Sequence, residues 1–491
     1  MKTIAISILI ILVTTCLFAD WNEMQNLLAS DGGDGERFGF SVSISGNYAV
    51  IGAYYDDDFG TAYMFTREGD IWTEQVKLSA SDGTVGDRFG YSVSIIGNYV
   101  LIGAYKDDDN GEDSGSAYIF FRTGDTWTEQ VKLTASDGST DDKFGYSVSI
   151  SENHALIGAY HDDDFGYNSG SAYIFTRTGD SWAELTKLIS SDSNEQDNFG
   201  ESVSIFEDYA AIGAGGNIYG MGSAYIFHNT NIGWIEQVRL TANDGHLYDK
   251  FGSSVAISEE YAVIGAEFDE TQGSNIGSAY IFTRNDDWSE HIKLSASDGA
   301  SGDRFGISIS IEGDNVVIGS IGDDDFTGSA YIFSYNGDLW LEQTKLTASD
   351  GLSWDRFGNT VSMSGTYVIV GAYGDDNPEI NAEVGSAYIF HNDGLGFEEQ
   401  TIHNSSLTNH NLSNNPNPFN PSTTISFTTE LTENTEIQIY NIKGQLVDTL
   451  PVNLSESEGN ITWDASKYSS GVYFYKLNIA DSPIKKMVLL K

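Results

Sequence analysis

The sequence predicts an all-β protein, a seven-bladed β-propeller followed by a small Ig-like β-sandwich. Two observations predict the propeller: a motif recurs seven times at intervals of 51 to 55 residues, and each copy contains four short strand-like segments. A third observation, the loss of this pattern after residue 402, predicts a separate second domain.

A Phe-Gly pair anchors each copy of the repeat. Its phenylalanines are Phe38, Phe89, Phe144, Phe199, Phe251, Phe305 and Phe357. The interval from this phenylalanine to a later glycine, as from Phe89 to Gly103, is the same in every copy, and so is the interval from the preceding tryptophan. Constant spacing indicates paired strands, because one added residue would turn every following side chain to the opposite face of the sheet. Nearly all length variation falls between the second and third segments, which predicts a surface loop there.

The four segments are clearest in the second copy, at residues 91–95, 100–104, 116–120 and 127–133. The first alternates polar and apolar residues, and the second is a continuous apolar run suited to burial on both faces. Four antiparallel strands in each of seven units fit a closed propeller better than a linear β-solenoid. Two extra copies of the fourth segment, at residues 21–25 and 397–400, are equal candidates for the strand that closes the ring.

Composition and the N-terminus limit the possible partners. The chain has 491 residues and a formal net charge of −48, which argues against nucleic acid and anionic membranes. Residues 1–19 predict a secretory signal peptide, with Lys2, an apolar run and Ala19 before the cleavage point. The single cysteine, Cys16, lies inside it, and lipidation there is the alternative to cleavage after Ala19. Cleavage leaves a mature chain with no cysteine and no transmembrane span.

The repeat resembles the FG-GAP repeat of integrin α-subunit propellers, on the Phe-Gly pair, the Ile-Gly-Ala triplet and the Ser-Ala-Tyr-Ile-Phe strand. The resemblance covers the whole repeat region and implies a seven-bladed ring. Integrin-type repeats that bind calcium carry an acidic loop between the first and second strands. Here that joint is only a tight turn, such as Gly97-Asn98, so the integrin metal site cannot be carried over.

Carboxylates are concentrated in the next connection instead, between the second and third strands. They are Asp56, Asp57, Asp58, Asp107, Asp108, Asp109, Asp162, Asp163, Asp164, Asp323, Asp324, Asp325, Asp375 and Asp376. The connection between blades is acidic too, and both should emerge on the same side of the ring. One interpretation is that several of these loops bind Ca²⁺ through hard oxygen ligands. The other is a solvated acidic rim that keeps the protein soluble.

Aromatic residues and histidines are the other residues that could contact a ligand. Tyrosines beside the acidic loops have two possible roles, packing or stacking on sugar rings: Tyr54, Tyr55, Tyr105, Tyr160 and Tyr373. The repeated tryptophans are expected in the core between blades. The eight histidines occupy non-equivalent repeat positions and have no metal-ligand spacing. No nucleophile motif occurs, so we expect no enzyme, with a hidden hydrolase or lyase site as the alternative.

After a polar stretch at residues 403–415, a second β-rich unit begins at a Pro-Asn-Pro-Phe-Asn-Pro segment. This segment, the Ile-Tyr-Asn-Ile-Lys-Gly hairpin and the basic C-terminus closely resemble the C-terminal sorting domain of type IX secretion cargo, which has a FlgD-like Ig fold. The resemblance implies a Gram-negative bacterium, passage through the outer membrane, and release or surface attachment.

We therefore expect a signal peptide (1–19), a propeller (20–402), a flexible linker (403–415) and a sorting domain (416–491). The expected function is a secreted or cell-surface, non-catalytic scaffold for adhesion or for binding an extracellular protein or glycan. Its other partner would be the type IX secretion machinery, through the C-terminal domain. A polysaccharide-active enzyme and a purely structural surface-layer component are the alternatives.

Overall fold

The computed structural model describes residues 21–216, 220–270, 274–284, 288–377, 382–392, 412–415, 422–428, 435–441, 446–452, 458–468, 470–477 and 485–489. The chain divides into two compact units, Met1–Leu395 and Gly396–Lys491. The expected signal peptide, the fourth-segment copy at 397–400 and most of the expected linker lie outside the described residues.

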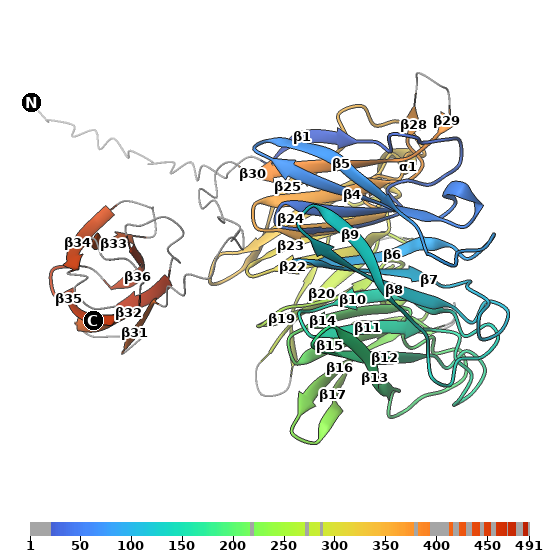
Figure 1. Cartoon of the computed structure of the whole chain (residues 1–491), viewed down its shortest axis with the longest axis horizontal. Coiled ribbons are helices and arrows are strands. Elements are labelled where there is room, and N and C mark those ends of the chain that lie inside the picture. Colours follow the sequence, from blue (N-terminus) through green and yellow to red (C-terminus); the bar gives the residue numbers. More distant parts are fainter. Residues whose placement is uncertain are drawn as a thin grey trace, which may run out of the picture. The chain divides into compact units, whose positions relative to one another are not determined.

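The first unit is the predicted propeller, built from seven four-stranded antiparallel sheets (Figure 1). Six blades take their strands from consecutive segments. They are β2 (Ser41–Ser45), β3 (Tyr48–Ala53), β4 (Thr61–Glu68) and β5 (Ile71–Leu78) in blade 1; β6 (Phe89–Ile96), β7 (Tyr99–Ala104), β8 (Ser116–Thr123) and β9 (Thr126–Leu133) in blade 2; β10 (Phe144–Ile150), β11 (His154–Ala159), β12 (Ser171–Thr178) and β13 (Ser181–Leu188) in blade 3; β14 (Ser202–Phe206), β15 (Tyr209–Ala214), β16 (Ser223–Thr230) and β17 (Gly233–Leu240) in blade 4; β18 (Phe251–Ile257), β19 (Tyr261–Ala266), β20 (Ser278–Thr283) and β21 (Ser289–Leu294) in blade 5; and β22 (Phe305–Glu312), β23 (Asn315–Ser320), β24 (Ser329–Tyr335) and β25 (Trp340–Leu346) in blade 6.

Blade 7 closes the ring with a strand from the other end of the chain. It contains β26 (Thr360–Ser364), β27 (Tyr367–Ala372), β30 (Ser386–Asn392) and, at its outer edge, β1 (Trp21–Leu27). Strand β1 runs antiparallel to β30, with Leu27 opposite Ala387. Glu23 accepts hydrogen bonds of 2.8 Å from both the backbone N–H and the hydroxyl of Ser349, as Glu129 does from Ser81 between blades 1 and 2. The N-terminal copy of the fourth segment is therefore the closing strand.

Two glycines meet at every joint between blades, which explains the constant spacing in the sequence. A Cβ added to Gly103 in β7 would lie 2.0 Å from the carbonyl oxygen of Gly145 in the next blade, a distance that real side chains do not reach. The hydroxyl of Ser92 donates to the same carbonyl at 2.8 Å. The blades thus pack at backbone contact, and a side chain at either glycine would force them apart.

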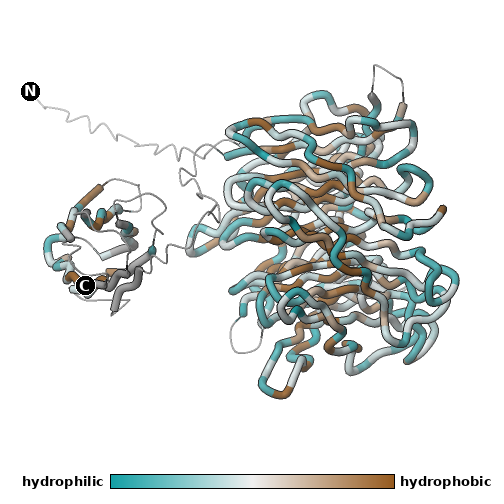
Figure 2. Tube along the Cα trace, in the orientation of Figure 1, coloured by the Kyte–Doolittle hydropathy of each residue, from teal (hydrophilic) through white to brown (hydrophobic). Residues whose placement is uncertain are grey.

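The core lies between successive blades. Phe89 of the Phe-Gly pair is fully buried, with its ring 5.4 Å from that of Tyr118 and 6.0 Å from that of Phe120 in edge-to-face contacts. The repeated tryptophans are buried as expected in five repeats, at Trp72, Trp127, Trp182, Trp288 and Trp340, whereas Trp21 and Trp234 are half-buried. Figure 2 shows the same division, with hydrophobic colour along the strands and hydrophilic colour in the outer loops.

The first strands of the seven blades surround the axis of the propeller. They line a cavity of about 190 Å³ with a ring of serines that includes Ser43, Ser94 and Ser362. Each of these hydroxyls accepts a hydrogen bond from the backbone N–H of the next blade, and the bond from Ile44 to Ser362 crosses the closing joint at 3.2 Å.

The acidic connections emerge together on one side of the propeller, which we call the loop face. The backbone N–H of Lys106, in the connection between second and third strands, donates to Asp87 O in the connection between blades at 3.2 Å. Short elements occur here as well: η1 (Asp56–Asp58), α1 (Asp323–Phe326), β28 (Asp376–Asn377) and β29 (Ala382–Glu383). The prediction that both sets of carboxylates share one face is therefore confirmed for the described residues.

The second unit consists of two small antiparallel sheets, as predicted. One contains β31 (Leu412–Asn415), β32 (Ser422–Thr428) and β35 (Glu458–Asp464). The other contains β33 (Thr435–Asn441), β34 (Leu446–Val452), β36 (Gly471–Leu477) and β37 (Lys485–Leu489). Side chains from both sheets, among them Ile425, Trp463 and Tyr475, form its buried core.

Candidate functional site

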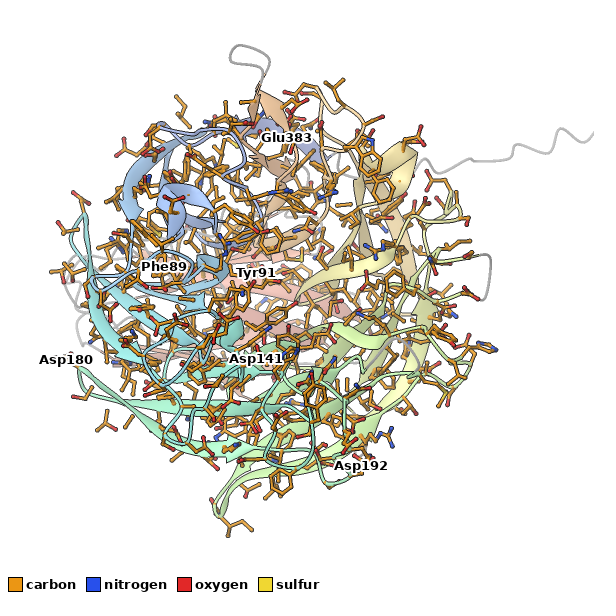
Figure 3. All side chains as sticks on the ribbon, turned by 90° about the vertical axis from the view of Figure 1, so that its right-hand side faces the viewer. Phe89, Tyr91, Asp141, Asp180, Asp192 and Glu383 are labelled. Atoms are coloured by element: carbon orange, nitrogen blue, oxygen red, sulfur yellow. The ribbon has the colours of Figure 1, made fainter. Side chains whose placement is uncertain are left out.

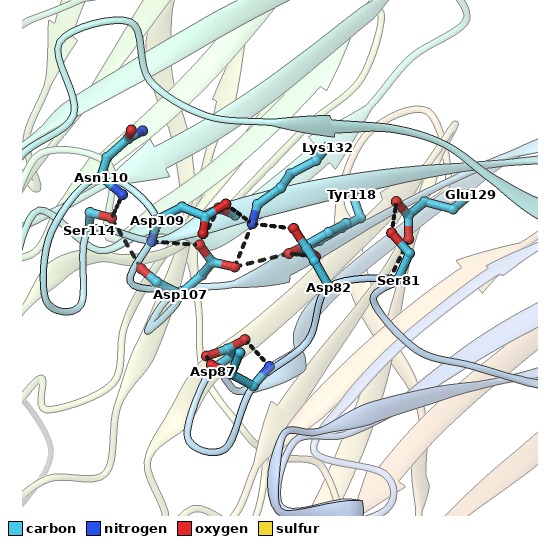
Figure 4. A network of polar contacts seen from close by, with 12 residues as sticks. Ser81, Asp82, Asp87, Asp107, Asp109, Asn110, Ser114, Tyr118, Glu129 and Lys132 are labelled. Carbon is cyan, nitrogen blue, oxygen red and sulfur yellow. Dashed lines mark hydrogen bonds and ion pairs between the residues drawn. The ribbon is translucent and has the colours of Figure 1, made fainter.

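The acidic loop of blade 2 surrounds a lysine (Figure 4). Lys132 Nζ, from β9, lies 2.8 Å from Asp82 Oδ2, 2.8 Å from Asp107 Oδ2 and 2.5 Å from Asp109 Oδ2. The hydroxyl of Tyr118 is also within hydrogen-bond distance of Asp107 and Asp82, at 3.0 and 2.9 Å. Asp107 is only 3% exposed, so this buried carboxylate depends on the ammonium and on its hydrogen-bond donors.

The same cluster recurs in four other blades, always with a lysine from the fourth strand. The ammonium groups are those of Lys77 (with Asp31, Asp56 and Asp57), Lys187 (with Asp137, Asp162 and Asp164), Lys293 (with Asp244 and Asp269) and Lys345 (with Asp298 and Asp323), at 2.5 to 2.9 Å. We call these five clusters the lysine clusters.

In each cluster, hydrogen bonds favour the charged form of the lysine and of the carboxylate from the connection between blades. Burial acts to lower the pKa of Lys132, but hydrogen bonds to Asp107, Asp109 and Asp82 outweigh it and raise that pKa. Burial acts in the opposite sense on Asp82, where hydrogen bonds from Lys132 and Tyr118 prevail and hold its pKa below the usual value. The ammonium therefore supplies, within the fold, the positive charge that these carboxylates need.

The predicted metal-ligating residues separate into three groups. The first carboxylate of each run is buried, at Asp56, Asp107, Asp162, Asp323 and Asp375. Three further members, Asp57, Asp109 and Asp164, contact a lysine. The remaining ones, Asp58, Asp108, Asp163, Asp324, Asp325 and Asp376, are exposed. Among the described residues, no three His, Cys, Asp or Glu side chains are grouped so as to hold a metal ion.

Sequence reasoning missed the lysines, although the signal was present. The fourth segment carries lysine just before its last leucine in five of the seven copies, as at Lys132 before Leu133. A cation at a fixed repeat position, opposite a carboxylate at another, indicates an ion pair once the strand order is known. Calcium binding by the acidic loops stays a prediction.

The acidic residues before the Phe-Gly pairs serve a local role. Asp87 Oδ2 accepts a hydrogen bond of 2.7 Å from the backbone N–H of Thr84, and Asp142, Asp303 and Asp355 each bond in the same way to the residue three positions before them. Burial raises the pKa of Asp142 and of Asp355 to about 6. These carboxylates hold the loops between blades in shape.

Two blades lack a lysine cluster. In blade 4, Arg239 pairs with Asp192 at 2.8 Å and with Ser223, and Gly215 follows the second strand where other blades have acidic loops. In blade 7 the closing strand supplies Asn26 at the lysine position, and its Nδ2 lies 3.3 Å from Asp350 Oδ2. Burial raises the pKa of Asp375 there, despite hydrogen bonds from Ser386 and Tyr388. Blade 7 thus has carboxylates without the lysine.

Aromatic rings gather at the centre of the loop face. They come from two positions of the repeat, directly after the Phe-Gly pair and directly after the Ile-Gly-Ala triplet. We call them the aromatic arc: Phe40, Tyr54, Tyr91, Tyr105, Tyr146, Tyr160 and Tyr373. All seven are partly exposed, and Figure 3, which views this face, shows Tyr91 near the middle of the disc.

The rings of the arc touch one another from blade 7 through blade 3. The centroid of Tyr373 lies 5.3 Å from that of Phe40, Phe40 lies 4.9 Å from Tyr91, and Tyr91 lies 5.0 Å from Tyr146. Of the predicted tyrosines, Tyr54, Tyr105, Tyr160 and Tyr373 belong to the arc, whereas Tyr55 lies outside it beneath Arg88. Phe40, Tyr91 and Tyr146 were missed because the sequence analysis assigned their position to a strand that alternates polar and apolar residues.

Glutamates occupy these same two repeat positions in the next two blades: Glu201 follows the Phe-Gly pair of blade 4, and Glu267 follows the Ile-Gly-Ala triplet of blade 5. Burial raises the pKa of Glu201 to about 6, and Lys250 Nζ, 3.7 Å away, offsets this only in part. Burial likewise raises the pKa of Glu267, whose Oε2 lies 3.7 Å from Arg304 Nε and makes no hydrogen bond to any described residue. A carboxyl of this kind can accept a hydrogen bond from a hydroxyl or amine of a ligand.

The lysine clusters predict the effect of one substitution in blade 7. We expect Asn26→Lys to place an ammonium beside Asp350 and Asp375, as Lys345 stands beside Asp298 and Asp323. It should stabilise the chain by about 1 kcal/mol, measured by denaturant unfolding at low salt. Asn26→Met, which has a similar stem but no charge, is the matched control. The prediction fails if Asn26→Met stabilises the chain as much as Asn26→Lys does, or if Asn26→Lys does not stabilise it.

The pKa of Glu201 predicts a second effect. Because its pKa is raised from 4.5 to about 6, the folded chain binds this proton more tightly than the unfolded chain. The resulting stability is present below pH 4.5 and is lost as the pH rises through 6. Glu201→Gln should therefore stabilise the chain at pH 8 by on the order of 1–2 kcal/mol, with no gain at pH 4. Thermal unfolding at both values checks this, with the exposed Glu207→Gln as control; equal effects at both pH values would refute it.

Comparison with known families agrees with this architecture. Seven segments match the FG-GAP repeat, at residues 21–65, 72–120, 127–175, 182–227, 234–282, 288–333 and 340–390. Residues 415–491 match the secretion system C-terminal sorting domain. No curated protein matches the chain.

The sorting domain implies handling by the type IX secretion system, and with it secretion or cell-surface attachment in Bacteroidetes. Among the described residues, no helix has the length and apolar character needed to span a membrane. The seven matching segments cover more than half of the chain, and together they contain the strands of the seven blades. The chain belongs to the FG-GAP repeat family, as a seven-bladed β-propeller that carries a type IX secretion sorting domain at its C-terminus.

Proposed function

We propose that the chain is a non-catalytic binding scaffold that adheres to an extracellular ligand through the centre of its loop face. The observation that supports this most is the aromatic arc, seven partly exposed rings linked by ring contacts on the face that carries the acidic loops. These rings are not part of the core, which consists of clusters of buried residues between successive blades. Aromatic rings with an apolar face and a polar edge are typical of binding surfaces.

The acidic loops have a supporting role in this proposal. The lysine clusters neutralise the carboxylates closest to the core, which favours the solvated rim over calcium-filled loops. The exposed carboxylates around them would repel anionic ligands and keep the secreted protein soluble. Calcium binding is the alternative, and it would add ligands from the exposed aspartates.

A polysaccharide-active enzyme is the second candidate function, and one observation favours it. Glu201, which is partly buried, and Glu267, which is buried, both have raised pKa values beside the arc, and glycoside hydrolysis requires a pair of carboxyls. Their pairing with Lys250 and Arg304 favours the binding role, because each cation assists the ionised form of its partner.

An array that carries polysaccharides together with collagen, fibronectin and mucin tests the proposal on the full secreted chain. We expect at least one ligand to be bound without turnover. Tyr91→Ser should weaken that binding about tenfold or more, because Tyr91 contacts four other rings of the arc. Serine stands at the equivalent position of blade 5, Ser253, so the fold accepts it.

Tyr167→Ser, which removes an exposed tyrosine outside the arc, is the matched control and should bind as the wild type does. Binding that survives Tyr91→Ser would contradict the site. Release of sugar products that Glu201→Gln abolishes would favour the enzyme, and no binding to any probe would favour a purely structural component.

A further inference from the structure

An exposed tryptophan stands on the loop face beside the aromatic arc. Trp354, in the connection between blades 6 and 7, is 58% exposed. Its ring stacks on that of Phe326 with the planes 6° apart and the centroids 4.6 Å apart. Because Phe326 covers one face of the indole, the exposed area belongs to the other face and to the edges. The pair presents a flat apolar surface to solvent.

The backbone at this tryptophan has a conformation that bulky side chains rarely adopt. Its position, three before the phenylalanine of each Phe-Gly pair, has a positive φ in all seven blades: Gly35, Gly86, Asp141, Gln196, Tyr248, Gly302 and Trp354. Three blades use glycine, which adopts this conformation without strain. Trp354 at φ 80° and Phe326 at φ 65° are both bulky residues in the left-handed region. The fold keeps this strain although the indole adds little to the core.

Arg356 connects the tryptophan to the aromatic arc. Its guanidinium lies 6.0 Å from the ring of Trp354 and 4.9 Å from that of Tyr373, and it donates a hydrogen bond to the Tyr373 hydroxyl. Its backbone N–H donates to Phe326 O at 2.9 Å, which fixes the loop of Phe326 to the loop of Trp354. The rings of Trp354 and Tyr373 therefore flank one guanidinium, and ring contacts continue from Tyr373 to Phe40 and on to Tyr91.

We propose that Trp354, supported by Phe326, is a stacking platform for a sugar ring of an uncharged polysaccharide that extends toward the aromatic arc. This inference rests on the proposed function and names the class of its ligand. The C–H face of a pyranose is apolar and matches the flat surface of an indole, while its hydroxyls can donate to carboxylates such as Asp324 and Asp325 at the edge of the platform.

Size and charge select this ligand over others. A protein partner buries about 800 Å² on each side, far more than one tryptophan with a neighbouring leucine, Leu352, can provide. The formal charge of −48 and the exposed aspartates beside Phe326 disfavour sulfated or uronic-acid chains. The row of rings suits an extended polymer better than a single sugar.

Affinity electrophoresis of the full secreted chain tests the inference, with amylose, laminarin, galactomannan and xyloglucan cast separately into native gels. At least one of them should retard the wild type, whereas alginate and heparin should not. Trp354→Gly should weaken this retardation about tenfold or more. Because glycine relieves the strain at φ 80°, this variant should melt no lower than the wild type, which separates ligand loss from unfolding. Trp354→Phe should retain most of the affinity.

Tyr248→Gly makes the same exchange at the equivalent position of blade 5 and should leave retardation unchanged. The inference is overturned if no neutral polysaccharide retards the chain, if only alginate or heparin does, or if Trp354→Gly binds as well as the wild type. If the chain binds collagen, fibronectin or mucin on the array through Tyr91 but no polysaccharide retards it, the inference is refuted and the proposed function stands. Retardation that depends on Trp354 but not on Tyr91 would instead refute the binding role of the aromatic arc.

Discussion

The ion pair between a fourth-strand lysine and a buried aspartate supports the loop face of this propeller. Five blades place an ammonium among two or three carboxylates, at 2.5 to 2.9 Å. Without it, residues such as Asp107 and Asp162 would be buried charges without a cation, a costly arrangement in a protein interior. The pair also ties the acidic loop to the outermost strand of its own blade, so that each loop has a fixed position from which it can present side chains to a ligand.

The ring beneath this face is held by backbone contacts that leave little freedom. Each joint brings the glycine of a second strand against the Phe-Gly carbonyl of the next blade, and this contact recurs at all seven joints. Each segment that matches the FG-GAP repeat begins one strand before a blade does, since it opens with the fourth strand of the preceding blade. This offset is why β1 completes blade 7 and why the two ends of the repeat array are locked together.

Much of this could be predicted from the sequence, because the determinants are periodic. The invariant spacing from Phe89 to Gly103 predicted paired strands, and the acidic runs predicted loops on one side. The choice of closing strand could not be predicted, because residues 21–25 and 397–400 carry equivalent patterns and differ only in the pairing that tertiary structure selects. The lysine clusters were missed for a related reason: Asp107 and Lys132 are distant in the sequence and meet only when the third and fourth strands fold back. Trp354 and Glu201 escaped notice because they are exceptions to the repeat, and an exception has no periodicity to reveal it.

We propose that the protein's own lysines, and not a bound metal, supply the positive charge of the acidic loops. Calorimetric titration of Ca²⁺ into the chelator-treated chain, combined with thermal unfolding in calcium and in chelator, tests it most directly. The account predicts no heat of binding above that of dilution and the same melting temperature in both buffers. Saturable binding with a stoichiometry of several ions, accompanied by a rise in melting temperature of several degrees, would contradict it.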